Sequence, residues 1–127
     1  MLTVVTDVFK MVGTAMGIAE ILLYQPKINI EGGEKITQET KDNGGISLEN
    51  IKFSYPTKTD ITVIKDVSIF IDCKKRIALV GSSGCGKSTI IQLVERFYDP
   101  LAGKVSYGSQ DLKGVEPVSF KSNMAIV

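Results

Sequence analysis

One glycine-rich run holds the residues in this sequence that are best suited to chemistry. It reads Gly81-Ser82-Ser83-Gly84-Cys85-Gly86-Lys87-Ser88-Thr89 and satisfies the phosphate-loop pattern G-x-x-x-x-G-K-[ST]. Glycines let the backbone turn successive N–H groups inward, which makes an anion-binding nest. From this frame Lys87 can reach the β- and γ-phosphates of a nucleotide, and the Ser88 hydroxyl can coordinate Mg²⁺. The pattern therefore predicts a nucleotide site.

The residues on either side of the loop supply the strand and the helix that it needs. The apolar run at residues 77–80 leads directly into Gly81 and predicts a strand buried on both faces, as in a parallel sheet. A helix is predicted after the loop, because its apolar residues recur at helical spacing, at Ile90, Ile91, Leu93, Val94 and Phe97. Such a helix directs the positive end of its dipole toward the phosphates.

Two further side chains each allow two interpretations. Tyr55 lies in Phe53-Ser54-Tyr55-Pro56, at the end of a predicted strand, where an aromatic ring either fills the core or stacks on a base. The residue types alone leave both open. Cys85, inside the loop, is either an inert small residue or a reactive thiol beside a lysine and a helix N-terminus. We expect it to be inert in normal function and open to alkylation.

The rest of the chain divides by its patterning. The first 24 residues carry an apolar helical stripe that ends at Gln25-Pro26, and the stripe either packs on the core or docks on an element elsewhere. Residues 27–45 are polar and punctuated by glycine, which favours a linker. Residues 46–55 and 66–71 alternate as strands. A slip of parity in the first strand predicts a β-bulge near Glu49-Asn50.

Composition excludes several classes of function. The 127 residues make about one domain, and their net charge of +1 gives no general attraction to nucleic acid. There is no histidine, so imidazole catalysis from within this chain is excluded. The two cysteines are too few for a disulfide framework or a zinc site, and we expect free thiols. Charges at Asp7, Lys10 and Glu20 interrupt the first apolar stretch and argue against a membrane span.

Three stretches together resemble the nucleotide-binding domain of ATP-binding cassette exporters, nearest to the multidrug-resistance, P-glycoprotein-like branch. They are residues 48–56, residues 81–89, and Glu95-Arg96-Phe97-Tyr98-Asp99-Pro100 with Gly103. The resemblance implies an α/β fold, a partial phosphate-loop NTPase core with an antiparallel β subdomain, preceded by an amphipathic helix. It implies three segments, which are a cytosolic tail of the last transmembrane helix (1–26), a linker (27–45) and the N-terminal part of the nucleotide-binding domain (46–127).

The resemblance also implies roles for individual residues. In that family the tyrosine at the Tyr55 position stacks on adenine, and Lys58 and Val63 fall where further contacts surround the adenine and its phosphates. ATP and Mg²⁺ are the implied cofactors, with Ser88 at the metal. The remaining implied nucleotide contacts are the loop residues Ser82, Ser83, Gly84, Cys85, Gly86, Lys87 and Thr89.

The resemblance sets expectations for the parent protein. Two such domains would sandwich ATP head to tail on the cytoplasmic face of a membrane, and hydrolysis in concert with a transmembrane domain would drive drug, lipid or xenobiotic efflux. The match ends at Met124-Ala125-Ile126-Val127, before the family's glutamine loop, signature motif, Walker B glutamate and switch histidine. We therefore expect no catalytic residue here, and weak or no ATPase activity from this chain alone. Two turns also depart from the family, with Lys74 for a glycine and Gly108-Ser109 for Asp-Gly.

Two other functions are compatible with parts of the sequence. A small phosphate-loop kinase or GTPase would share the loop, although such enzymes commonly open with the strand that leads into it. A truncated product that binds partners through its N-terminal stripe needs no nucleotide. Preference for guanine would favour the first alternative, and association without nucleotide binding would favour the second.

Overall fold

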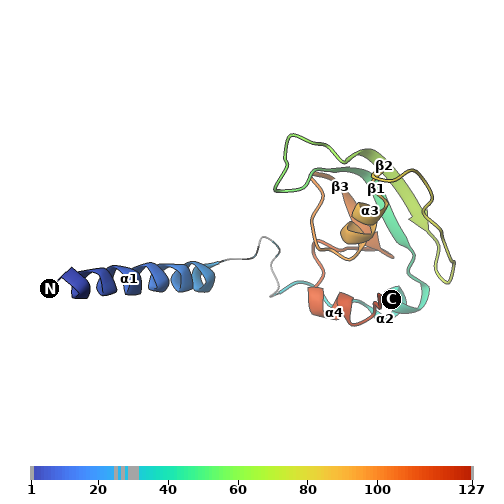
Figure 1. The fold of residues 1–127 in the computed structure, drawn as a ribbon. Coiled ribbons are helices and arrows are strands. Elements are labelled where there is room, and N and C mark those ends of the chain that lie inside the picture. The colour runs from blue at the N-terminus through green and yellow to red at the C-terminus, as the bar shows by residue number, and fades with distance from the viewer. Residues whose placement is uncertain (1, 25, 27, 29–31, 127) are drawn as a thin grey trace.

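The structure is a computed structural model that describes residues 2–24, 26, 28 and 32–126. Gln25, where the first helix was expected to close, residues 29–31 of the expected linker, and Val127 lie outside these residues. The elements, in chain order, are α1 (Leu2–Leu23), α2 (Gln38–Asn43), β1 (Ile46–Phe53), β2 (Ile64–Ile71), α3 (Lys87–Val94), β3 (Ala102–Tyr107), β4 (Gln110–Asp111) and α4 (Pro117–Lys121). Figure 1 shows α1 standing apart from a body that the other elements form.

The sheet has four strands in the order β2-β1-β3-β4, and every pairing is antiparallel. The predicted bulge in β1 is confirmed, since the register with β2 shifts between Leu48 and Ile51 and Asn50 has a φ of 49°. The extra residue lets side chains of opposite parity reach the same face. As a result Leu48, Ile51 and Phe53 are all buried, with exposed fractions of 1%, 0% and 1%.

The phosphate-loop helix α3 packs against the sheet through a single apolar core. Leu93 of α3 is 1% exposed and belongs to the same cluster as the buried side chains of β1. The cluster continues into the C-terminal part of the chain, with Val105, Leu112, Val115 and Phe120. The core therefore fixes the helix that follows the loop relative to the strand that ends near Tyr55.

Part of the segment that the sequence predicts as a linker packs on the body. Glu34 forms an isolated parallel bridge with Val115, and Ile36 is buried. Thr37 then caps α2, because its side chain accepts a hydrogen bond from the Thr40 amide. Hydrogen bonds also join this stretch to the body, from the Ile36 amide to Oγ of Ser119 and from the Thr37 amide to Oε1 of Gln110. The polar, glycine-containing composition of the stretch gave no sign of these distant partners.

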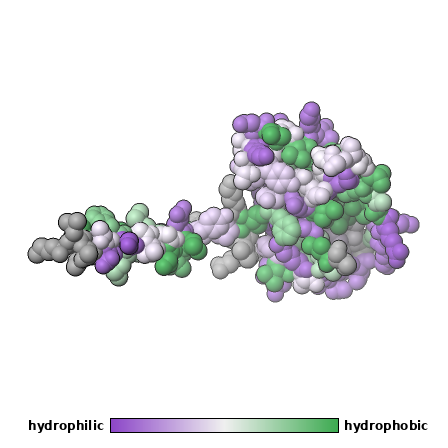
Figure 2. Space-filling view, in the orientation of Figure 1, coloured by the Kyte–Doolittle hydropathy of each residue, from purple (hydrophilic) through white to green (hydrophobic). Residues whose placement is uncertain are grey.

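The apolar run at residues 77–80 is not a strand, contrary to the sequence prediction. Ile77 is 49% exposed and Val80 is 87% exposed, so the run is not buried either. A strand needs a hydrogen-bonded neighbour, and none of the strands in the described residues pairs with this run. Ile77 and Val80 therefore add to the exposed apolar surface of the chain, and Figure 2 shows green, apolar side chains at the surface of the body.

The first helix is present as the sequence predicted, and the apolar side chains that the structure describes on it are exposed. Phe9 is 73% exposed and Leu22 is 78% exposed. Of the two interpretations of the apolar stripe, packing on the chain's own core is therefore wrong. Within the part of the chain that the structure describes, no helix combines the length and the apolar character that crossing a membrane requires.

Two turns depart from the pattern of the family that the sequence resembles, and both have defined geometry. Lys74 has a φ of 59°, in the left-handed region that favours glycine. Gly108-Ser109 form a two-residue hairpin loop, since Tyr107 pairs with Gln110 across it. Gly108 has a φ of 58° while Ser109 is not among the positive-φ residues. Glycine in the first central position is typical of a type II′ turn, so the order Gly-Ser fits this hairpin.

Candidate functional site

The glycine-rich run forms an irregular loop that leads directly into α3. Gly84 has a φ of 79° and Gly86 has a φ of 92°, both in the region that side chains disfavour. Gly86 is the N-cap of α3, and a Cβ placed there would lie 3.7 Å from Cγ1 of Val63. The pattern's glycines are therefore required by the backbone at these two positions.

The N-terminus of α3 offers backbone donors to this loop. The first hydrogen bond along the helix runs from the Ile90 amide to the Gly86 carbonyl oxygen, at 3.0 Å. The amides of Lys87, Ser88 and Thr89 precede it and so have no acceptor within the helix. No side chain caps this end. Unpaired amides at the positive end of a helix dipole suit an anion such as phosphate.

The Lys87 ammonium lies across the loop. Its Nζ donates to the Gly81 and Ser82 carbonyl oxygens at 2.9 and 2.7 Å, and to Sγ of Cys85 at 3.5 Å. The positive charge of Lys87 therefore lies against the backbone of the glycine-rich loop. Ser82, Ser83, Cys85 and Ser88 are all exposed, so their side chains are open to a ligand. The reactivity of the free Cys85 thiol stays a prediction.

Tyr55 lies beside α3, and its ring is half-buried. The ring makes edge-to-face contacts with Phe53 and Tyr98, at centroid distances of 5.1 and 5.4 Å. Its hydroxyl lies 2.9 Å from Oγ1 of Thr89 and donates to Oε1 of Gln92 at 2.8 Å. The structure thus brings Tyr55 to the helix that follows the phosphate loop. Stacking of the ring on adenine stays a prediction.

The other predicted site residues take different positions around Tyr55 and the loop. The Thr89 side chain is buried against Tyr55, so a phosphate contact from this residue would use its backbone amide. Val63 lies next to Gly86. Lys58 follows Tyr55 in a turn, in which its amide donates to the Tyr55 carbonyl oxygen at 2.9 Å. Gln92 was missed by sequence reasoning, although its spacing of three from Thr89 places both on one helix face.

The end of α3 differs from the prediction. The helix ends at Val94, and Phe97, expected on its apolar face, lies outside it and is 50% exposed. The Arg96 amide donates to the Leu93 carbonyl oxygen and the Phe97 amide donates to that of Gln92. With a φ of 53° at Arg96, these bonds form a Schellman motif, which usually has glycine at that position.

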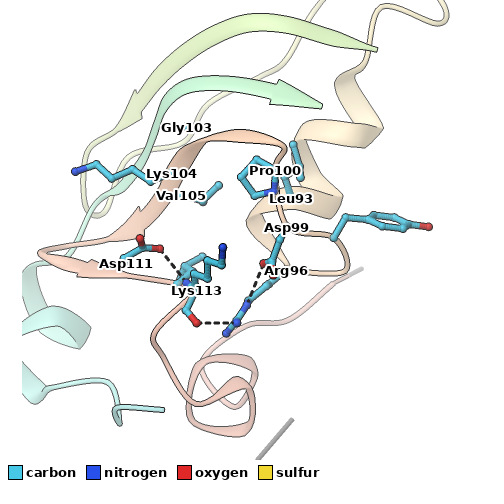
Figure 3. A pocket seen from close by; sticks show the side chains of 11 residues that line it. Leu93, Arg96, Asp99, Pro100, Gly103, Lys104, Val105, Asp111 and Lys113 are labelled. Carbon is cyan, nitrogen blue, oxygen red and sulfur yellow. Dashed lines mark hydrogen bonds and ion pairs between the residues drawn. The ribbon is translucent and has the colours of Figure 1, made fainter. Parts of the chain in front are cut away.

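The Arg96 side chain explains why a non-glycine residue ends this helix. It is 7% exposed, and its guanidinium donates to the carbonyl oxygens of Val115 and Lys113, both at 2.8 Å. Its Nε also contacts Oδ1 of Asp99 at 3.4 Å. Figure 3 shows the Arg96 contacts with Lys113 and Asp99 beside a small cavity of about 40 Å³. Arg96 therefore ties the end of the phosphate-loop helix to the C-terminal segment, and sequence reasoning did not identify this role.

Comparison with known families assigns the chain. The family model described as ABC transporter matches residues 64–127, which is about half of the chain and includes the whole phosphate loop. The chain belongs to the ABC transporter family. Membership implies a domain of the ATP-binding type and confirms the resemblance found in the sequence. It also confirms the fold class, a partial phosphate-loop NTPase core with an antiparallel sheet.

Individual relatives of this ABC transporter chain are named as multidrug transporters. It is 38% identical over 126 residues to an ABC multidrug transporter of Cryptococcus neoformans, a match that covers 98% of the chain and 9% of that protein. It is 41% identical over 126 residues to Multidrug resistance protein 1 of Entamoeba histolytica, again covering 98% of the chain and 9% of the relative. The chain therefore spans about a tenth of the length of these relatives.

A solved structure shows the same arrangement of elements. The ABC chain superimposes on a bacterial Atm1-family ABC exporter with ATP bound, with a TM-score of 0.75 and 26% identity. The match covers 88% of this chain and 19% of that one. The likeness extends beyond the span of the family model and includes most of the residues before Ile64.

Proposed function

We propose that this chain is the ATP-binding segment of an ABC-type exporter. The observation that carries the proposal is the loop at residues 81–89, where unpaired helix amides and the Lys87 ammonium converge. In the intact protein, ATP binding and hydrolysis would drive efflux of a drug, lipid or xenobiotic. Membership of the ABC transporter family and the multidrug relatives support this proposal.

The residues of the loop fit ATP and Mg²⁺. The amides of Lys87, Ser88 and Thr89 would bind phosphate oxygens, and the Lys87 ammonium would exchange the Gly81 and Ser82 carbonyls for the β- and γ-phosphates. The exposed Ser88 hydroxyl would hold Mg²⁺, which neutralises phosphate charge when bound. Among the described residues no cluster of three or more histidine, cysteine, aspartate or glutamate side chains gathers, so phosphate oxygens would complete the metal's ligands.

The base and the remaining contacts are assigned to residues outside the loop. Tyr55 would stack on adenine, because it lies beside α3 at the end of β1. Val63, which lies next to Gly86, and Lys58, which follows Tyr55 in a turn, would flank the nucleotide. The site would then extend from the phosphate loop to the turn after β1.

The proposed parent protein supplies the partners. Residues 1–26 would be the cytosolic tail of a transmembrane helix, residues 27–45 a connection that packs in part on the body, and residues 46–127 the N-terminal part of a nucleotide-binding domain. A transmembrane domain of the same transporter and a second nucleotide-binding domain would be the partners. The segment would work at the cytoplasmic face of a membrane.

The chain by itself is proposed to bind ATP with little or no hydrolysis. Hydrolysis needs a positioned water and a base, and no acidic residue of this chain stands at a motif position for that role. A steady-state phosphate-release assay on the purified chain checks this. Turnover that Lys87→Ala abolishes would contradict it.

Binding is tested by calorimetry with ATP and Mg²⁺ on the wild-type chain and on Lys87→Ala. Removing the ammonium deletes charge-assisted hydrogen bonds, and we expect affinity to fall by roughly tenfold or more. Lys104→Ala is the matched control, because Lys104 is 53% exposed and pairs with Glu49 in β1. Equal affinity in all three proteins would contradict the proposal. A preference for GTP would instead favour a kinase or GTPase.

A further inference from the structure

Two side chains of α3 form hydrogen bonds with the hydroxyl of Tyr55. Thr89 and Gln92 are three residues apart, so they lie on the same face of the helix. Their Oγ1 and Oε1 atoms are 2.9 and 2.8 Å from the Tyr55 hydroxyl oxygen. Thr89 is 4% exposed, so this contact is shielded from water on one side. None of the comparisons with known proteins assigns a role to this pair.

The donor and the acceptor in each of these two hydrogen bonds can be assigned. A phenol has a single hydrogen, and Oε1 of Gln92 accepts it. Oγ1 of Thr89 must then be the donor to the Tyr55 oxygen. Both hydrogen-bonding capacities of the hydroxyl are therefore used by α3, and the two bonds hold the ring from one end.

The rest of the ring is held by aromatic packing. Phe53 and Tyr98 meet it edge to face, with interplanar angles of 78° and 90°. Contacts of this geometry fix the tilt of a ring as well as its position. Together with the hydroxyl bonds they leave Tyr55 a single orientation relative to α3.

We propose that Thr89 and Gln92 are positioning residues for the nucleotide base. α3 begins at Lys87 in the phosphate loop and also carries Thr89 and Gln92. The hydrogen bonds from these two side chains therefore hold the Tyr55 ring at a fixed distance from Lys87. A ligand whose triphosphate lies on the loop then meets the ring at the distance set by the helix. The pair thereby determines how well the site accepts a purine nucleoside triphosphate rather than a phosphate chain alone. This inference rests on the proposed function and deepens it.

The experiment measures equilibrium binding of two ligands by calorimetry, ATP with Mg²⁺ and tripolyphosphate with Mg²⁺. Tyr55→Phe keeps the ring and loses the hydroxyl, Thr89→Val loses the donor, and Gln92→Leu loses the acceptor. For each we expect ATP to bind about fivefold more weakly, while tripolyphosphate binds as in the wild type. Thr14→Val, which loses a hydroxyl in the exposed helix α1, is the matched control and keeps wild-type affinity for ATP.

A double-mutant cycle in ATP affinity tests whether Tyr55 and Gln92 act through the hydrogen bond between them. Tyr55→Phe removes the bond to Gln92 together with the bond to Thr89, so adding Gln92→Leu to it should cause no further loss of ATP affinity. Unchanged ATP affinity in all three variants overturns the inference. An equal loss for ATP and tripolyphosphate also overturns it, because the substitutions then disturb the loop and not the base. A wild-type chain that binds neither ligand overturns the proposed function itself, whereas one that binds both and ignores the variants overturns only the positioning role.

Discussion

At the scale of the single residue, Arg96 both ends helix α3 and connects it to the C-terminal segment. Its backbone takes the left-handed conformation that ends α3, and its guanidinium binds the carbonyl oxygens of Lys113 and Val115. A buried charged donor of this kind is costly to remove, because it leaves its acceptors unpaired. The structural importance of Arg96 therefore exceeds that of the exposed Arg76.

Replacing Arg96 by alanine should lower the free energy of unfolding by about 3 kcal/mol. Arg96→Gly loses the same guanidinium bonds but fits the left-handed backbone, so it should be less destabilising than alanine by about 1 kcal/mol. Urea denaturation of both variants measures the difference. Arg76→Ala is the matched control and should change stability by less than about 0.5 kcal/mol. Alanine and glycine variants of equal stability would contradict the assigned backbone role.

At the scale of the elements, the pairing of β1 with β3 depends on one glycine. Gly103 has a φ of 84°, and a Cβ placed there would collide with the Glu49 and Asn50 carbonyl oxygens at the bulge of β1. The bulge in β1 therefore requires a glycine at position 103, because the backbone of β3 comes too close to the bulge to leave room for a side chain.

We expect Gly103→Ala to destabilise the fold by about 2 kcal/mol or more, because it combines a strained φ with a backbone collision. Thermal unfolding followed by circular dichroism measures this. Gly13→Ala is the matched control, since Gly13 lies in the exposed helix α1 and has nothing within 4 Å of an added Cβ. It should be neutral or favourable to α1. A Gly103→Ala protein as stable as Gly13→Ala would refute the proposed fit.

The elements also show what sequence patterns could and could not predict. The phosphate loop, α3 and the bulge in β1 were predictable because each follows from residues a few positions apart. The run at residues 77–80 was not, because a strand depends on a neighbour that local pattern does not contain. The end of α3 was missed for a related reason, since the position of Arg96 is set by the distant carbonyls of Lys113 and Val115. In the site, the same limit hid the Tyr55 contacts with Thr89 and Gln92.

At the scale of the whole molecule, apolar surface is left uncovered next to the candidate site. A groove of about 490 Å³ lies between β2, residues 77–79 and α3. Its walls include Ile77, which is 49% exposed, and Ile91, which is 50% exposed. Contiguous apolar surface of this kind promotes association between molecules.

The chain should therefore associate reversibly as its concentration rises, and Ile91→Lys should reduce this association. Because Ile91 is half exposed, the substitution should cost less than about 1 kcal/mol of stability. Sedimentation velocity over a concentration series measures the effect. Val118→Lys is the matched control, because it adds the same charge on α4, outside the groove. A chain that stays monomeric at every concentration, or equal association in both variants, would count against this prediction.

The sheet order has a consequence for the sequence of folding events. β1 pairs with β3, although β2, the phosphate loop and α3 all lie between them in the chain. Pairing of β1 with β3 therefore closes a long segment of chain that contains the candidate site. Closing such a segment costs conformational entropy before the contacts between the two strands stabilise it. During synthesis the phosphate loop leaves the ribosome well before β3. We therefore expect the sheet that supports the phosphate loop to be completed only after β3 has been synthesised, and nucleotide to bind after that point.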